Sequence, residues 1–179
     1  MMSSDRLIFG RPVKEDLKRF YKINADPDTN LFNPSGPMSL ETAEKAFNEM
    51  TAHWEVNGFG TWSISEKENP GSIIGFGGLC DRLYGNETKL NLGYRFDKNY
   101  WGKGYATELA QNAIAFGFNE LNKNEIFAIV RPKHLASIRV LEKCKMKLVD
   151  KLNDVPNAEH SLIYKIEIKD TRDDIYHKG

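Results

Sequence analysis

The feature that most constrains this chain is a glycine-spaced turn between a strand pattern and a helix pattern. Apolar residues alternate with Asn, Gly and Arg over residues 90–96, which predicts a strand, and a helical pattern covers 106–121. Between them stands Trp101-Gly102-Lys103-Gly104-Tyr105-Ala106. A strand that ends in such a turn and feeds a helix directs several unpaired N–H groups at one point, where the helix dipole is positive. The segment therefore predicts an anion site that suits a pyrophosphate.

Two familiar glycine fingerprints do not fit this turn, although its glycines suit an anion. Gly102 and Gly104 let the main chain approach phosphates closely or adopt a positive φ, and Lys103 adds a positive charge. A dinucleotide-binding loop needs glycine where this chain has Thr107, and a Walker loop needs glycine where it has Asp97. A nucleotide-binding protein is therefore the weakest interpretation of the turn.

The turn resembles the acetyl-CoA loop of the GNAT acyltransferases, whose pattern is Arg or Gln, two residues, Gly, one residue, then Gly or Ala. Trp101, Gly104 and Ala106 occupy the key positions. Trp101 in place of Arg or Gln is similar to the branch that contains the ribosomal-protein N-terminal acetyltransferases. Further segments resemble that branch in order and spacing: Arg6-Leu7-Ile8-Phe9-Gly10-Arg11-Pro12, Gly58-Phe59-Gly60-Thr61-Trp62, Ile74-Gly75-Phe76-Gly77-Gly78-Leu79, Leu92-Gly93-Tyr94, Pro132-Lys133-His134-Leu135-Ala136-Ser137 and Val140-Leu141-Glu142-Lys143.

The resemblance implies the GNAT fold, an α/β (α+β) architecture with a central mixed, largely antiparallel, splayed sheet. About seven strands and four or so helices are expected. In that fold the strand with residues 93–96 splays away from the strand at 126–130, and the pantetheine arm of acetyl-CoA lies in the opening. The implied cofactor-binding residues are Tyr94, Arg95, Phe96, Trp101, Gly102, Lys103, Gly104, Tyr105, Ala106, Thr107, His134 and Ser137.

The same resemblance implies two catalytic candidates. Ser137 matches the family serine whose hydroxyl bonds the leaving sulfur, and His134 stands where the family usually has Asn and can take part in proton transfer. Each candidate also has a plain structural explanation: Ser137 as the N-cap of the next helix, and His134 as a loop residue with no role. The cofactor-binding candidates Tyr94 and Phe96 are likewise explained as core residues. Lys145-Met146 stand where the family usually has Gly-Phe.

The remaining patterns agree with one domain at residues 1–169 and a polar tail at 170–179 that we expect to be loose. A chain of 179 residues can bury roughly 70% of its unfolded surface in one domain. Ser39 is the expected N-cap of a helix that runs to residue 56. The other expected helices cover 14–25 and 136–144, and the other expected strands cover 6–11, 61–66, 72–79, 126–130, 147–151 and 161–169.

Composition narrows the partners of the protein. Lys plus Arg and Asp plus Glu each number 25, so no net charge attracts nucleic acid or an anionic membrane. The absence of a charged-then-apolar leader and of an apolar run near 18 residues predicts a cytoplasmic protein. We expect a monomer or homodimer. Cys80 and Cys144 are expected to be buried free thiols, and four scattered histidines argue against a metal site.

The chemistry expected of such a site is direct acetyl transfer from acetyl-CoA to an amine, because no residue spacing marks a covalent nucleophile. Many relatives place a Glu where this chain has Asn91, which leaves Asp81, Glu66 or a water chain as candidate bases. Neutralising a lysine ammonium at pH 7 costs about 4.6 kcal/mol, against about 1.2 kcal/mol for an α-amine. A protein N-terminal α-amine is therefore the leading acceptor. A polyamine or aminoglycoside is the alternative acceptor, and a catalytically silent acyl-CoA-binding or sensing module is the rival function.

The acceptor pocket is expected between the first two helices and the loop after Leu79. Several aromatic residues lie near it in sequence order and are either pocket lining or core: Phe32, Trp54, Phe59, Trp62 and Tyr84.

Overall fold

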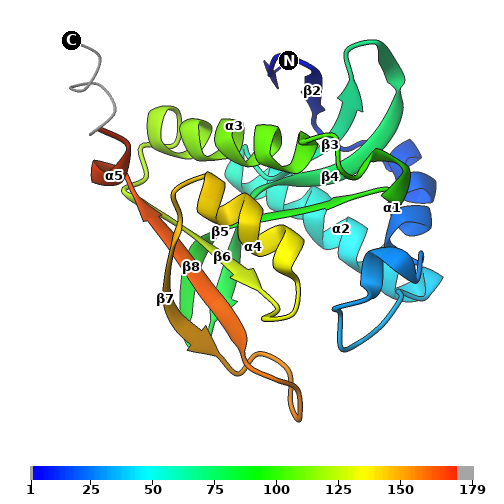
Figure 1. Ribbon diagram of the computed structural model, residues 1–179. Helices are drawn as coiled ribbons and strands as arrows, with labels where there is room; N and C mark the ends of the chain where they lie inside the picture. Colours follow the sequence, from blue (N-terminus) through cyan, green and yellow to red (C-terminus); the bar gives the residue numbers. More distant parts are fainter. Residues whose placement is uncertain (1, 173–179) are drawn as a thin grey trace.

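The computed structural model describes residues 2–172 as a mixed sheet covered by helices (Figure 1). Eight strands form one sheet in the order β1-β2-β3-β4-β5-β6-β8-β7, and every neighbouring pair is antiparallel except β5 and β6. The predicted fold class is confirmed. The expected strands are present, and the short β1 is an eighth. Their bounds are β1 (Met2–Ser3), β2 (Leu7–Gly10), β3 (Thr61–Glu66), β4 (Asn69–Tyr84), β5 (Glu87–Phe96), β6 (Glu125–Val130), β7 (Lys147–Leu152) and β8 (Ser161–Glu167).

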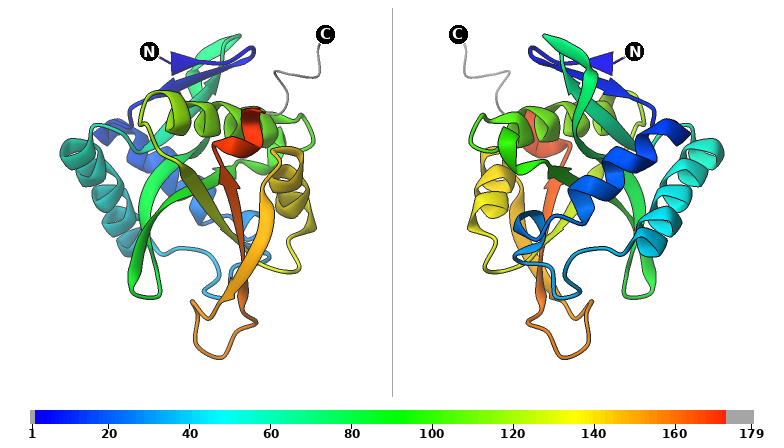
Figure 2. Two further views of the ribbon diagram at one scale, coloured as in Figure 1. Left: turned by 90° about the vertical axis from the view of Figure 1, so that its left-hand side faces the viewer. Right: turned by 90° about the vertical axis from the view of Figure 1, so that its right-hand side faces the viewer.

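Helices cover both faces of the sheet. α1 and α2 lie on one face, and α3 and α4 on the other (Figure 2). Phe20 of α1 and Phe47 of α2 pack on Phe76 of β4, whereas Leu109 and Ala113 of α3 belong to the larger core on the opposite face. The helices are α1 (Leu17–Asn24), α2 (Leu40–Asn57), α3 (Tyr105–Asn119), α4 (Leu135–Lys143) and α5 (Lys169–Arg172), with 3-10 turns η1 (Lys14–Asp16), η2 (Asp28–Asn30) and η3 (Lys98–Tyr100).

Helix α2 forms where its local signals predict. Ser39 is its N-cap, and the Ser39 Oγ accepts a hydrogen bond from the Thr42 N–H at 3.1 Å. Gly58 ends the helix with φ +72°, and its N–H donates to the Trp54 carbonyl at 3.0 Å. Ala43 and Phe47, one turn apart, are fully buried and fix the face that meets α1 and the sheet.

The sheet opens between β5 and β6, as the resemblance implied. On one side β5 pairs continuously with β4, from Gly75 opposite Phe96 to Tyr84 opposite Glu87. On the other side, Asn91 opposite Phe127 is the one registered pair between β5 and β6 in the part of the chain described. The strands diverge beyond that pair, so β5 presents backbone groups without strand partners along residues 92–96.

The β4–β5 hairpin is longer than predicted. The strand expected at 72–79 extends to Tyr84, because Cys80, Asp81 and Arg82 continue to pair with β5 even though they are polar or partly exposed. At the other end of the chain the last strand stops at Glu167. Residues 169–172 form α5, where Asp170 is paired with Lys147 at 2.7 Å, and residues 173–179 lie outside the described residues.

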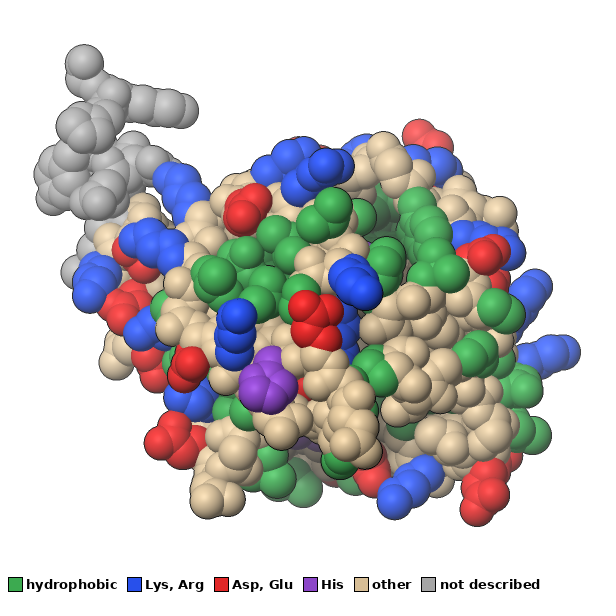
Figure 3. All heavy atoms as spheres, turned by 60° about the horizontal axis from the view of Figure 1, so that its bottom comes forward, with side chains coloured by type: hydrophobic (Ala, Val, Ile, Leu, Met, Phe, Trp, Pro, Cys, Tyr) green, Lys and Arg blue, Asp and Glu red, His purple; other side chains and the backbone are tan. Residues whose placement is uncertain are grey.

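The two cysteines are free, and the surface carries mixed charge. Cys144 is buried as predicted, while Cys80 is only half-buried, and burial raises the pKa of the Cys144 thiol to about 11. On the face in Figure 3, basic and acidic side chains are interspersed among hydrophobic ones. Over residues 2–172, no helix is long and apolar enough to cross a membrane. Within the same range, no group of three or more metal-ligating side chains is assembled.

Candidate active site

The opening between β5 and β6 continues into a cleft of about 1110 Å³. Its walls come from β5, the start of α3, the start of α4, residues 128–131 and the segment that links α1 to α2. All of the predicted site residues line it except Lys103. Segments that are far apart in the sequence therefore meet around one elongated cavity.

The glycine turn forms one end of the cleft. Gly102 and Gly104 have φ values of +75° and +82°, and Gly104 is the N-cap of α3. The N–H of Glu108 is the first to find a helical partner, the Gly104 carbonyl at 3.1 Å. The N–H groups of residues 102–107 have no hydrogen-bond partner in the described chain. Free donors beside the positive end of a fifteen-residue helix suit a pyrophosphate.

Lys103 does not line the cleft. Its Nζ lies 3.7 Å from the Glu66 Oε1 and 4.8 Å from the centre of the Tyr100 ring. Glu66 also accepts a hydrogen bond from the Tyr105 hydroxyl at 2.5 Å and does not line the cleft. Glu66, one of the candidate bases, therefore takes part in fixing the outer side of the turn.

Arg6 supports the turn from outside, a role that the sequence did not suggest. Its Nη1 donates to the Lys103 carbonyl at 2.9 Å, and its Nε and Nη2 both lie 2.7 Å from the Glu108 Oε2. Glu108 also accepts from the Ser4 hydroxyl at 2.6 Å. Burial alone would raise the pKa of Glu108, but the hydrogen bonds from Ser4 and Arg6 lower it.

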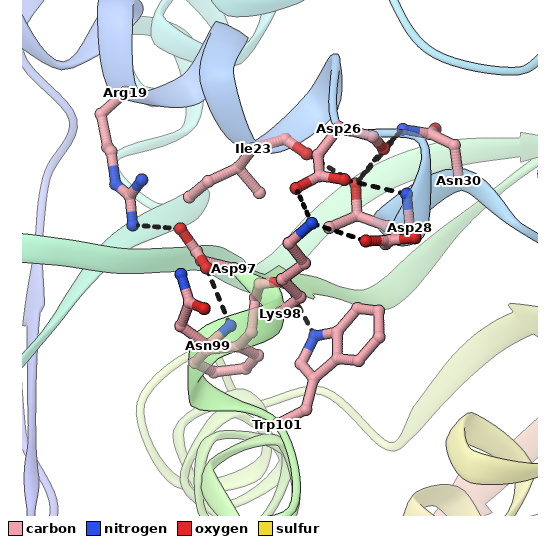
Figure 4. Close-up of polar contacts among 11 residues, drawn as sticks. Arg19, Ile23, Asp26, Asp28, Asn30, Asp97, Lys98, Asn99 and Trp101 are labelled. Carbon is pink, nitrogen blue, oxygen red and sulfur yellow. Dashed lines mark hydrogen bonds and ion pairs between the residues drawn. The ribbon is translucent and has the colours of Figure 1, made fainter.

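A polar cluster ties the residues before the turn to the α1–α2 segment (Figure 4). The Lys98 Nζ lies 2.5 Å from Asp28 and 3.4 Å from Asp26. Trp101, which replaces the usual Arg or Gln of the family, donates its indole N–H to the Phe96 carbonyl at 3.0 Å. This bond joins the end of β5 directly to the turn, and the Trp101 ring borders the cleft.

Ser137 and Tyr94 meet in the middle of the cleft. Their hydroxyl oxygens are 2.9 Å apart, and burial raises the pKa of Tyr94, which keeps the phenol protonated at neutral pH. The N-cap of α4 is His134, so Ser137 lies within the first turn and the alternative that it caps the helix is wrong. Tyr94 also packs against the main core, and Phe96 is buried in it, so both contribute to packing as well as to the cleft.

His134 closes the cleft together with a residue from the α1–α2 segment. Its ring stacks on Phe32 with centroids 4.6 Å apart and planes at 22°. Burial and the nearby Arg95 charge lower the pKa of His134, so the imidazole is neutral at pH 7. Of the aromatic candidates for the acceptor pocket, Phe32 alone lines the cleft. The others pack in or against the core: Trp54, Phe59, Trp62 and Tyr84.

The position at which relatives carry a glutamate is used structurally here. Asn91 is buried, and its Oδ1 accepts a hydrogen bond from the Tyr84 hydroxyl at 2.8 Å. Asp81 lies 3.6 Å from the His53 Nε2 and does not line the cleft. Neither Asp81 nor Glu66 therefore faces the space in which an amine and a thioester would meet.

Three charged residues that the sequence did not single out line the cleft: Arg82, Arg131 and Asp154. Asp154, from the β7–β8 connection, has its Oδ1 3.5 Å from Arg131 and its Oδ2 3.9 Å from Arg82. Arg131 follows β6, and Arg82 lies on the unexpected extension of β4. No local motif marks these residues, and a correct length for the β4–β5 hairpin is the signal that could have found Arg82.

The family's usual Gly-Phe pair after α4 has a structural equivalent in Lys145-Met146. Lys145 has φ +63°, the left-handed conformation for which glycine is favoured, and Met146 is buried in the main core. Both positions therefore keep the backbone and packing roles despite the different side chains.

Comparison with known proteins agrees with this geometry. Residues 6–147 match the model of a family described as acetyltransferase (GNAT) domain. The uncharacterized protein YkkB of Bacillus subtilis (strain 168) is 37% identical over 121 residues, which are 68% of this chain and 69% of that one. The uncharacterized N-acetyltransferase p20 of Bacillus licheniformis is 28% identical over 166 residues, 89% of each chain.

Solved structures share the fold at lower identity. Spermidine N-acetyltransferase from Vibrio cholerae, in complex with CoA and spermine, has a TM-score of 0.71 at 17% identity, covering 90% of this chain and 95% of that one. RimL, a ribosomal α-N-protein acetyltransferase in complex with coenzyme A, has a TM-score of 0.73 at 14% identity, covering 92% and 96%. The ribosomal branch is thus one among several structural neighbours.

Proposed function

The chain belongs to the GNAT acetyltransferase family, and from this premise we propose that it moves the acetyl group of acetyl-CoA directly to a primary amine, with a protein N-terminal α-amine as the leading acceptor. The observation that carries the proposal is the single cleft that joins the N–H groups of the glycine turn to the Ser137–Tyr94 pair. We assign the part of this cleft lined by residues 28–35, Arg82, Arg95, Arg131, His134 and Asp154 to the acceptor and call it the acceptor end.

The residues that would hold acetyl-CoA are those of the turn and of the open edge of β5. The N–H groups of residues 102–107 would bind the pyrophosphate, and the backbone of residues 93–96 would pair with the pantetheine arm. Gly102 and Gly104 have a left-handed backbone, and a residue with a Cβ at either position would resist that conformation. When bound, acetyl-CoA supplies the acetyl thioester.

Ser137 and Tyr94 are the groups that would stabilise the departing sulfur. Thiols have a reference pKa of about 8.5, so at neutral pH the sulfur needs a hydrogen-bond donor more than a strong acid. A serine hydroxyl whose oxygen lies 2.9 Å from a protonated phenol is such a donor. The phenol can donate its own hydrogen bond to the serine oxygen, which leaves the serine hydroxyl hydrogen free to point to the sulfur. We therefore assign Ser137 to the sulfur and Tyr94 to positioning Ser137.

The proton on the amine is the part of the reaction for which the chain provides least. Asn91 cannot act as a base, and Glu66 and Asp81 do not line the cleft. The simplest route is binding of an amine that has already lost its proton, which favours an α-amine over a lysine side chain. His134, neutral at pH 7 and exposed to the cleft, is the alternative proton acceptor.

The structural neighbours represent both kinds of acceptor, since one acts on spermidine and another on a protein N-terminus. The choice of an α-amine rests instead on the proton argument. The experiment is a screen of coenzyme A release with peptide N-termini, polyamines and aminoglycosides at matched concentration. We expect peptide α-amines to give the highest kcat/KM. Slow acetyl-CoA hydrolysis that no amine accelerates would contradict the proposal and support a silent acyl-CoA-binding module.

A further inference from the structure

Arg95 is a charged side chain in the cleft that lacks a charged partner. Its Nη1 donates to the Asn30 Oδ1 at 2.6 Å, and no carboxylate in residues 2–172 lies within ion-pairing distance of it. Burial lowers the pKa of this guanidinium, which reflects the cost of holding its charge away from water. Four of its five N–H donors remain available, so the side chain can still bind a planar anion through two parallel hydrogen bonds.

Arg95 and Tyr94 are neighbours on β5 with different partners, and we assign the Arg95 side chain to the acceptor. Successive side chains on a strand point to opposite faces, and Tyr94 points to Ser137 of α4. Arg95 points instead to Asn30 in the α1–α2 segment. Arg95 and His134 both line the cleft, and the Arg95 charge contributes to lowering the pKa of His134.

The carboxylates of the cleft are already paired with cations. Asp28 lies 2.5 Å from Lys98, and Asp154 lies between Arg82 and Arg131. Among the described residues that line the cleft, these are the acidic side chains, and neither is left to receive a polycation. The acceptor end thus carries an excess of positive charge, which opposes a polyamine.

We propose that Arg95 binds a carboxylate carried by the acceptor, so that the preferred substrate is a peptide N-terminus with an acidic side chain in its first residues. This inference rests on the proposed function and names its substrate class. The required chemistry is an amine and a carboxylate in one molecule, and the α-carboxylate of a free amino acid is the second possible source.

The test compares acceptors of matched size that differ in the charge of one group, with rates for the serine pair expressed per free amine. Wild-type kcat/KM is measured for peptide amides that begin Ser-Glu and Ser-Gln, and separately for free serine and serinamide. We expect the Ser-Glu peptide to be preferred by about tenfold or more, as a charge-assisted bidentate hydrogen bond provides. A preference confined to serine over serinamide would assign the anion site to a free amino acid and overturn the proposal that the substrate is a peptide. Ratios near one in both pairs would overturn the inference.

Substitutions test whether Arg95 causes the preference for the Ser-Glu peptide. Arg95→Met should reduce the Ser-Glu to Ser-Gln ratio to about one, and Arg95→Lys should give an intermediate ratio because it keeps the charge but loses the fork. Arg11→Met is the matched control, since Arg11 pairs with Glu55 outside the cleft, and its ratio should equal that of the wild type. An undiminished ratio in folded Arg95→Met would contradict the proposal.

Two measurements keep this inference separate from the proposed function. Calorimetric binding of the two peptides, with coenzyme A present, reads the same charge preference without turnover. Binding that favours Ser-Glu in a protein that acetylates no amine would refute the transferase proposal and retain the anion site. Turnover with equal kcat/KM for the two peptides would refute the anion site and retain the transferase proposal. If Arg95→Met loses its circular dichroism signal, the wild-type ratio and Arg95→Lys decide.

Discussion

The two ends of the cleft are built in different ways. At the proposed cofactor end, the pyrophosphate site is one continuous stretch, residues 101–107, whose backbone would form the cradle. The proposed acceptor end combines the 28–35 segment with side chains from other places in the chain: Arg82, Arg95, Arg131, His134 and Asp154. Backbone donors bind any pyrophosphate, whereas an assembly of side chains can change its charge and shape with single substitutions. The comparison suggests that the first end preserves the chemistry of the family and the second determines the acceptor.

The electrostatics of the two ends differ in the same sense. At the cofactor end, Lys103 and Arg6 are engaged with Glu66 and Glu108 outside the cleft, and the attraction for an anion comes from N–H groups and the helix dipole. At the acceptor end the charge is on side chains, and Arg95 has no carboxylate partner within residues 2–172. Perturbing backbone geometry should therefore damage the first end most, and changing charge should damage the second.

The largest effect is expected from Gly104→Val. A β-branched residue resists a φ of +82°, so the turn should rearrange and coenzyme A affinity should fall about 100-fold, the equivalent of roughly 2–3 kcal/mol. Calorimetry measures the affinity and circular dichroism the fold. Gly85→Val is the matched control, because Gly85 has φ +64° in a hairpin turn that does not line the cleft. An unchanged affinity in folded Gly104→Val would show that this turn does not hold the cofactor.

A smaller effect is expected from Ser137→Ala, at the point where the two ends meet. Loss of a hydrogen bond that strengthens as the sulfur departs should lower kcat about tenfold and change the KM for acetyl-CoA much less. Tyr94→Phe should lower kcat in the same direction, and the double variant should lose less than the sum because the hydroxyls act as a pair. A raised KM for acetyl-CoA with an unchanged kcat would indicate a binding role instead.

The smallest effect concerns the brace outside the turn. The folded-state pKa of Glu108 is lowered from about 4.5, so its carboxylate contributes stability above that pH, and the contribution is lost as pH falls through the lower folded-state pKa. Glu108→Gln should reduce the free energy of unfolding at pH 7 by about 1 kcal/mol. The difference from wild type should shrink as the pH falls below about 4.5.

Chemical denaturation at several pH values measures this difference. Glu55→Gln is the control, since Glu55 pairs with Arg11 at an exposed site and should change stability very little. A Glu108→Gln deficit that stays constant from pH 7 to pH 3 would mean that the carboxylate charge is not what stabilises the turn.

Sequence reasoning predicted the strand, glycine turn and helix of residues 90–121 because their determinants are local. The alternation of residues 90–96, the two glycines and the following helix lie within about thirty residues of one another, and their physical roles depend on backbone conformation. The resemblance then supplied Ser137, which the structure places against Tyr94. That the Tyr94 side chain would orient Ser137 was not foreseen, because an alternating pattern explains a tyrosine as core.

The acceptor end could not be predicted in the same way. Arg82 was missed because polar residues after Leu79 indicate a loop, although they continue the hairpin with β5. Asp154 lies in a polar connection whose position depends on how β7 and β8 pair. Arg6 was noticed only as part of a family-like segment, and its contact with Lys103 is 97 residues away in sequence. Such contacts depend on tertiary packing and leave no periodic signal.

The group that accepts the proton of the amine determines how kcat/KM depends on pH. If the cleft contributes no carboxylate to the amine, kcat/KM should follow the fraction of acceptor that has lost its proton. If His134 takes the proton, an ionisation of the enzyme should limit the rate at low pH, and His134→Asn should remove it. The lowered pKa of His134 means that its own limb would lie below the usual value for histidine.

The most direct test is the pH dependence of kcat/KM with two acceptors. One is a peptide with a free α-amine, and the other is a matched peptide that is blocked at its N-terminus and has a lysine side chain as its free amine. Direct transfer to a free amine predicts that each profile rises until near the pKa of its own amine, so the two limbs should lie about 2.5 pH units apart. At pH 7 the lysine peptide should be the poorer acceptor by a factor of roughly 100 or more. An acidic limb that stays at one pH for both acceptors would contradict the account and require a base within the enzyme.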